Sequence, residues 1–190
     1  MAKKESSFKN MVITLLVVTV LASSALAYIN ELTKGPIEEA KLKAKLEAIG
    51  KVVPEFNNNP SEEMYTIQSD LGELECYPAK QSNKLVGTAI STLTKLGFSG
   101  TIRIMVGISP EGKIINSVVL EHSETPGLGS KMTQAKFKDQ FKNLDPAKEE
   151  LKVTKDGGVI DAITASTITS RAYCDAVQRA YNAYRKGGLK

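Results

Sequence analysis

Tryptophan is absent from this 190-residue sequence, and aromatic residues make up only 6% of it. The chain therefore has few aromatic side chains on which nucleic-acid bases could stack. The chain has one histidine, His122, and two cysteines, Cys76 and Cys174, with no CxxC pair. Because zinc and iron–sulfur sites need clusters of such ligands, we expect neither from this chain alone. The cysteines leave two interpretations open: a Cys76–Cys174 disulfide, or two buried, unpaired thiols.

Basic residues do not gather into a stripe. The formal net charge is +4, and three lysines against one glutamate in the first ten residues supply half of it. The rest of the chain lacks the dense positive charge that binding to a phosphate backbone requires. We therefore expect no nucleic-acid partner.

Charge is missing altogether from the run MVITLLVVTVLASSALAY at 11–28. This run approaches the roughly 20 residues that a helix needs to cross a bilayer. It has two interpretations: a signal peptide cleaved after the small-x-small sequence Ala25-Leu26-Ala27, or a retained anchor. The run exceeds the roughly 7–15 apolar residues of a usual signal peptide, which favours the anchor. We predict a cytoplasmic N-terminus at 1–10 and one transmembrane helix at 11–28.

Lysine density gives a direction to this anchor. Three lysines lie in the ten residues before the run, and four lie in the twenty after it. Because positive charge tends to stay on the cytoplasmic side, this difference favours a short N-terminus inside the cell. The larger part of the chain would then lie on the extracytoplasmic, or periplasmic, side of the membrane.

A second helix is predicted directly after the anchor. Thr33 suits its N-cap, Pro36 suits its first turn, and Pro54 would end it. Apolar residues recur in it at helical spacing, namely Leu42, Leu46, Ile49 and Val53. They form one face of the helix, which favours contact with the core or with a neighbouring protein. We assign 29–60 to this juxtamembrane helix and a linker, and 61–190 to one folded domain.

The remaining pattern alternates strand-like segments with turns. Strands are predicted at 73–77, 85–92, 101–108 and 113–121, and the last two join through the hairpin turn Ser109–Gly112. Helices are predicted at 133–141 and 167–184. The apolar face of the last helix comprises Tyr173, Val177, Ala180, Tyr181 and Tyr184. We therefore predict an α+β fold, a mostly antiparallel sheet with flanking helices.

Five hydroxyl groups lie within seven residues at the start of the last helix, from Thr164 to Ser170. Such residues commonly cap a helix, because their side chains satisfy its free N–H groups. The same N–H groups and the positive end of the helix dipole also suit a phosphate. A threonine hydroxyl at this place is well positioned to carry one. Composition alone leaves both interpretations open.

A second segment of interest is His122–Gly129. Pro126 stiffens it, and the two glycines permit unusual backbone shapes and the close approach of a flat ligand. Taken alone, it is also an ordinary loop at the end of a strand. Nothing near His122 in the sequence forms a Ser/His/Asp arrangement, so a nucleophilic hydrolase has little support.

Together the two segments resemble motifs of the FMN-binding domain family. HSETPGLG at 122–129 matches the family loop H-x-E-T-P-G-L-G at each fixed position, and DAITAST at 161–167 resembles the flavinylation motif D-x-x-[ST]-G-A-T. The resemblance covers nearly the whole chain, including the anchor. Chain length favours the branch of the G subunits of Rnf ion-translocating electron-transport complexes over the longer C subunits of the sodium-translocating NADH:quinone reductase.

The chain departs from the flavinylation motif at two positions. Ala165 stands where the family has glycine, and Ser166 stands where it has alanine. Ser166 thereby becomes a rival acceptor beside Thr167. Thr167 aligns with the threonine that the family modifies, and Asp161 keeps its spacing. We therefore predict attachment at Thr167.

The resemblance implies FMN as a covalent cofactor, joined by a phosphoester to Thr167. A flavin transferase would attach it, using FAD and magnesium. The flavin ring would lie against the loop 125–129, with an apolar contact from Leu128. The implied cofactor-binding residues are Glu124, Thr125, Gly127, Leu128, Gly129, Lys131, Thr164 and Ser166, with Asp161 as part of the flavinylation motif. No catalytic residue and no metal ligand is predicted.

The implied function is electron relay within a membrane-bound, ion-translocating ferredoxin:NAD oxidoreductase complex, by a redox subunit that is not catalytic by itself. Its partners would be the other membrane and peripheral subunits, the flavin transferase during maturation, and the lipid bilayer. The chain would span the cytoplasmic membrane once. Two alternatives stay open: a flavin-free scaffold or assembly module of the same fold, and a secreted hydrolase released after Ala27.

Overall fold

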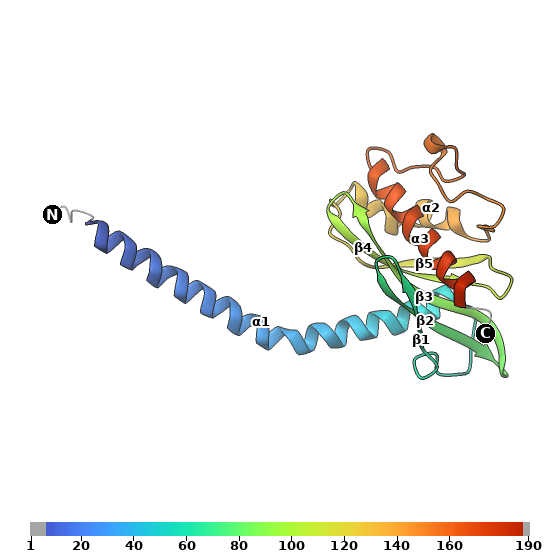
Figure 1. The fold of residues 1–190 in the computed structure, drawn as a ribbon, viewed down its shortest axis with the longest axis horizontal. Coiled ribbons are helices and arrows are strands. Elements are labelled where there is room, and N and C mark those ends of the chain that lie inside the picture. Colours follow the sequence, from blue (N-terminus) through green and yellow to red (C-terminus); the bar gives the residue numbers. More distant parts are fainter. Residues whose placement is uncertain (1–6, 188–190) are drawn as a thin grey trace. The chain divides into compact units, whose positions relative to one another are not determined.

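The computed structural model describes residues 7–187 and divides the chain into two compact units, 1–43 and 44–190. Most of the predicted cytoplasmic N-terminus at 1–10 lies outside the described residues. The first unit is the N-terminal part of helix α1 (Phe8–Val52). Within α1, an exposed window is long and apolar enough to cross a membrane, by length and composition (Figure 1). This finding agrees with the prediction of a membrane helix.

The predicted break between an anchor and a second helix is wrong. α1 is continuous, and Pro36 lies inside it. Thr33 is not an N-cap, because its hydroxyl donates back to the carbonyl oxygens of Ile29 (2.9 Å) and Asn30 (3.3 Å). Proline removes one N–H from the ladder and crowds the carbonyl of residue i−4, but the residues after Pro36 are strong helix formers, and the helix continues.

The second unit is built on a five-stranded sheet with strand order β1-β2-β3-β4-β5. All neighbouring strands are antiparallel. The strands are β1 (Tyr65–Ser69), β2 (Gly72–Gln81), β3 (Lys84–Gly97), β4 (Gly100–Ile108) and β5 (Ile114–Glu121). This architecture confirms the predicted α+β class. The sequence missed β1, a five-residue edge strand that is nowhere fully buried.

Short helical elements connect the sheet to a long C-terminal helix. They are η1 (Gly129–Thr133), α2 (Ala135–Lys138), η2 (Asp139–Phe141) and η3 (Thr154–Asp156), and the last helix is α3 (Thr167–Gly187). The predicted helix at 133–141 is therefore broken into one turn of α-helix followed by a turn of 3-10 helix. The predicted start of α3 is confirmed.

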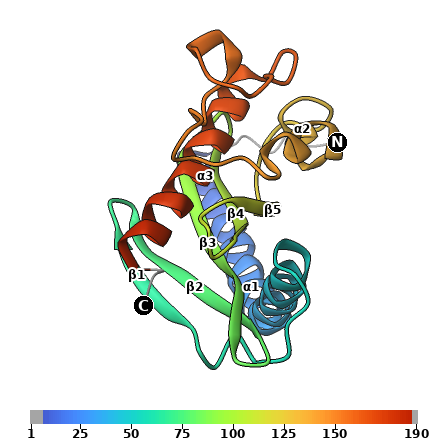
Figure 2. The same cartoon turned by 90° about the vertical axis from the view of Figure 1, so that its right-hand side faces the viewer.

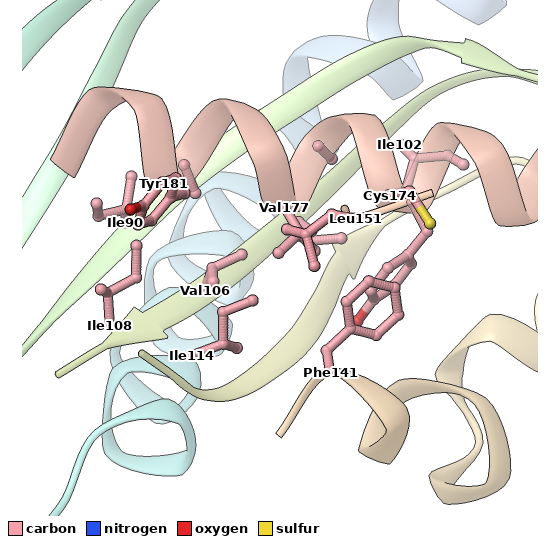
Figure 3. Close-up of a cluster of buried hydrophobic side chains, with 14 of the residues drawn as sticks. Ile90, Ile102, Val106, Ile108, Ile114, Phe141, Leu151, Cys174, Val177 and Tyr181 are labelled. Carbon is pink, nitrogen blue, oxygen red and sulfur yellow. The ribbon is translucent and has the colours of Figure 1, made fainter. Parts of the chain in front are cut away.

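The main core lies between α3 and one face of the sheet. All five residues of the predicted apolar face of α3 are buried. Figure 2 shows α3 lying across β3 and β4, and Figure 3 shows Val177 and Tyr181 facing isoleucines and a valine of the sheet. Near the start of α3, Tyr173 packs edge-on against Phe137, with ring centroids 5.3 Å apart. This packing holds the start of α3 against α2.

The opposite face of the sheet is covered by the last residues of α1. Ile49 and Val52 are buried there, together with Ala79, Ala89 and Met105 of the sheet. Of the predicted apolar stripe, Ile49 and Val53 belong to this core, whereas Leu42 and Leu46 are exposed. The stripe is therefore core only at its C-terminal end.

Both cysteines are free and buried, which confirms the unpaired alternative. Burial is the main cause that raises the pKa of each thiol, to about 12 for Cys76 and for Cys174. Since the thiolate is the reactive form, both side chains are inert packing residues of the core at neutral pH.

Candidate functional site

The loop after β5 is shaped by its own backbone. The carbonyl oxygen of Thr125 accepts the N–H groups of Leu128 (3.2 Å) and Ser130 (3.3 Å). Gly127 has a φ of 76°, which favours glycine, and its N–H donates to the hydroxyl of Ser130 at 2.9 Å. Residues 125–128 are exposed. The loop therefore presents a small exposed surface whose shape is held by its own hydrogen bonds.

Glu124 lies just before this surface and is only 4% exposed. Its Oε1 accepts the backbone N–H of Ser99 at 2.9 Å, and its Oε2 accepts the hydroxyl of Thr169 at 2.6 Å. Ser99 lies between β3 and β4, and Thr169 lies in the first turn of α3. One buried carboxylate thus joins three segments that are distant in sequence, and it brings the two sequence motifs together.

The segment 161–167, which resembles the flavinylation motif, is held by side chains that precede it and follow it in the sequence. Gln140 bonds the backbone of Asp161 twice, accepting its N–H at 2.7 Å and donating to its carbonyl oxygen at 3.2 Å. Ser170 accepts the N–H of Ile163 at 2.9 Å and donates to the carbonyl oxygen of Ser166 at 3.0 Å. The turn before α3 is therefore anchored at its start and at its end.

The five hydroxyls of this segment have different surroundings. Those of Thr169 and Ser170 are buried and engaged in the bonds described above. Ser166 is only 8% exposed. Thr164 is exposed, and Thr167 is half-buried at the first residue of α3. Accessibility thus separates Thr164 and Thr167 from the other three.

The start of α3 offers free backbone donors. Its first intrahelical bond runs from the N–H of Ser170 to the carbonyl oxygen of Ser166. The N–H groups of 167–169 therefore precede the helical ladder, where a helix has no carbonyl to offer them. Together with the positive end of the helix dipole, they form the kind of place where a phosphate binds.

A hollow of about 450 Å³ adjoins this helix start. It is lined by Lys131, Gln134, Lys136, Phe137, Gln140, Asp161, Ala162, Ile163 and Thr164. The volume lies within the roughly 300–1,000 Å³ typical of small-molecule sites. Two lysines in the lining suit an anionic ligand. Three predicted site residues, Lys131, Asp161 and Thr164, meet in this one place.

Several residues of the site carried no separate signal in the sequence. Ser99 and Gln140 come from distant segments of ordinary turn and helix composition, so their contacts with Glu124 and Asp161 depend on the fold. Thr169 and Ser170 belong to the hydroxyl cluster, but the sequence does not show which hydroxyls are engaged internally. Leu128, to which the resemblance assigns an apolar contact with the flavin, is 42% exposed, and Ile168 beside Thr167 is 48% exposed.

Comparison with known proteins shows one matching family model and several similar proteins. Residues 97–182 match the family model of the FMN-binding domain. The G subunit of the Na(+)-translocating ferredoxin:NAD(+) oxidoreductase complex of Acetobacterium woodii is 35% identical, over 90% of this chain and 88% of that protein. The G subunit of the ion-translocating oxidoreductase complex of Shewanella amazonensis is 34% identical, over 84% and 80%. Among solved structures, NqrC of Shewanella oneidensis matches with 25% identity and a TM-score of 0.46, over 62% of this chain and 61% of that one.

Proposed function

Because this chain belongs to the family of G subunits of ion-translocating oxidoreductase complexes, we propose that it relays electrons through an FMN joined by a phosphoester to Thr167. The main support is that the bond between Glu124 and Thr169 brings the loop 125–129 next to the start of α3, where the free donors and the half-buried Thr167 lie. In this role the chain binds and orients the cofactor, which supplies the redox chemistry when bound.

Burial supports Thr167 as the attachment residue. An acceptor hydroxyl must reach FAD in the active site of a flavin transferase, and Thr167 is more accessible than its neighbour Ser166, which is 8% exposed. In the transfer, the threonine oxygen would bond to the FMN phosphorus of FAD. The bond between the two phosphates would break, AMP would leave, and the hydroxyl proton would be lost.

The surroundings of Thr167 suit the product of that reaction. A phosphodiester keeps one negative charge, which the N–H groups of 167–169 and the helix dipole would stabilise. Lys131 and Lys136 line the adjoining hollow and add positive charge. The exposed loop, with Leu128, would lie against the flavin ring. Gly127 leaves room for a flat ligand, since nothing lies within 4 Å of a Cβ built there.

The membrane placement is also part of the proposal. α1 would anchor the chain through 11–28, with the folded domain at 61–190 on the extracytoplasmic side. A covalent tether suits that side, because a domain outside the cytoplasm cannot count on free FMN to refill an empty site. The partners would be the other subunits of the complex, the flavin transferase and the bilayer.

Intact-mass measurement of the chain coexpressed with a flavin transferase tests the proposal. We expect the wild type and Ser166→Ala to gain the mass of one FMN less one water, and Thr167→Ala to gain nothing. Persistence of the gain in Thr167→Ala would place the flavin elsewhere. A wild type without any gain would favour the flavin-free scaffold.

A further inference from the structure

We propose that Glu124 is a positioning residue, whose buried carboxylate sets the loop 125–129 at a fixed place relative to the start of α3. This inference rests on the proposed function, because the loop would face the flavin ring and α3 would carry its phosphate. In this role Glu124 acts through the loop and the helix, and not as the direct cofactor-binding residue that the resemblance implies.

The bonds of Glu124 support this assignment. Both carboxylate oxygens are engaged by donors of the protein, the N–H of Ser99 and the hydroxyl of Thr169. Hydrogen bonds to an ionised acceptor are shorter and stronger than neutral ones, and the 2.6 Å distance to Thr169 is typical of an O–H donor on a carboxylate. Thr169 lies two residues after Thr167. The carboxylate therefore connects the loop directly to the turn that would carry the flavin.

Two glycines enclose the carboxylate. A Cβ atom on Gly129 would collide with Oε2 and would lie 2.8 Å from the hydroxyl oxygen of Thr169. A Cβ atom on Gly97 would lie 2.9 Å from Oε1. Since real Cβ atoms are essentially never found so close, the backbone at Gly129 is shaped around Glu124, whereas at Gly97 the carbonyl oxygen of Gly100 lies nearer still than Oε1. The second glycine of the loop motif is thereby explained by packing against this side chain.

The other hydrogen bonds of the loop are local. Within residues 7–187, the hydrogen bonds found for 125–128 run among themselves and to Ser130 and Lys131. These bonds fix the shape of the loop but not its place relative to α3. Small displacements matter at a site of this kind, since a misplacement of about 1 Å can cost on the order of 100-fold in rate.

Thr169→Val removes the hydroxyl donor and keeps the side-chain shape, so it releases the loop from α3. Thr92→Val is the matched control, because Thr92 donates a buried hydroxyl bond from β3 to the carbonyl oxygen of Ala176 in α3, away from the site (3.2 Å). Each variant loses one buried hydrogen bond that joins α3 to another segment of the chain. Thr169→Ser restores the donor and tests for rescue.

Three quantities are measured for these variants and the wild type: melting temperature, rate of FMN attachment by the transferase, and midpoint potential of the attached flavin. We expect Thr169→Val to slow attachment about tenfold or more and to shift the potential. Thr92→Val should match the wild type in both, although it also loses a buried bond and melts at a lower temperature, and Thr169→Ser should recover most of the wild-type behaviour. In the flavin-free Thr167→Ala chain, amide exchange of Leu128 and Ser130 should be faster with Thr169→Val than with Thr92→Val.

If Thr169→Val changes attachment, potential and exchange no more than Thr92→Val does, Glu124 is only a structural residue and the inference is overturned. The proposed function survives that result, because the wild type would still carry flavin. A wild type that takes up no FMN overturns the proposed function itself, together with this inference.

Discussion

Ala165 occupies the left-handed region of backbone space, with a φ of 61°. The flavinylation motif that the sequence resembles has glycine here, and glycine adopts this conformation without the steric cost that a Cβ brings. Alanine in place of the motif's glycine therefore strains the backbone locally at this position. Its motif neighbour, Ser166, differs by one hydroxyl on a nearly buried side chain.

We predict that Ala165→Gly stabilises the chain by about 1 kcal/mol, since relief of the left-handed strain outweighs the added freedom of the unfolded chain. Denaturant unfolding gives the free energy. Ala162→Gly is the control in the same segment, and it should destabilise, because Ala162 has no positive φ and packs partly against the core. Destabilisation by both substitutions would show that the strain is absent.

The buried thiols give a prediction about pH. Burial raises the pKa of Cys174 to about 12, above its ordinary value of 9.0. The unfolded chain therefore releases this proton at lower pH than the folded chain does. The stabilisation from the buried thiol is complete below about pH 9 and is lost as pH rises toward about 12.

Between about pH 9 and about pH 11, the free energy of unfolding should therefore fall less steeply with pH in Cys174→Ala than in the wild type. The difference in slope should correspond to about one proton. Urea unfolding at a series of pH values measures this slope for the wild type and the variant. The small cavity left by the substitution shifts all values together and leaves the slope difference intact. Equal slopes would mean that the thiol ionises as easily in the folded chain as in the unfolded one.

At the scale of elements, the turn that leads into α3 depends on Ser170. Its hydroxyl accepts the N–H of Ile163 and donates to the carbonyl oxygen of Ser166, and the side chain is fully buried. We predict that Ser170→Ala costs about 1–2 kcal/mol and slows FMN attachment, because the turn before Thr167 loses its internal support. Thr133→Val is a control that removes an exposed hydroxyl bond in η1. Attachment as fast as in the control would contradict this role of Ser170.

The same scale shows how far the sequence predicts the fold. The hairpin turn, four of the five strands and the start of α3 were predictable, because alternation, turn residues and helical spacing are local signals. The continuous α1 was not, since Pro36 is a local break signal that the neighbouring helix formers override. For the site, the two motifs located the participating residues. The bonds of Glu124 to Ser99 and Thr169 depend on tertiary structure and left no trace in the spacing.

At the scale of the whole molecule, α1 must remain on the chain if it is to serve as an anchor. We predict that the mature chain keeps residues 1–27 and fractionates with membranes through high-salt washing, because its apolar window is long enough to span the hydrocarbon core. A reporter active only outside the cytoplasm, fused at the C-terminus, should be active. N-terminal sequencing checks retention. A mature N-terminus at Tyr28 would instead indicate a signal peptide.

The proposed electron relay depends above all on where the flavin is attached. Trypsin should release the peptide 156–171, which contains all five hydroxyls of the motif segment and no other attachment candidate. Fragmentation of this peptide, from wild-type chain coexpressed with a flavin transferase, locates the added mass on a single residue. We predict one FMN phosphoester on Thr167. An unmodified peptide, or an FMN on any other residue, would contradict the central claim.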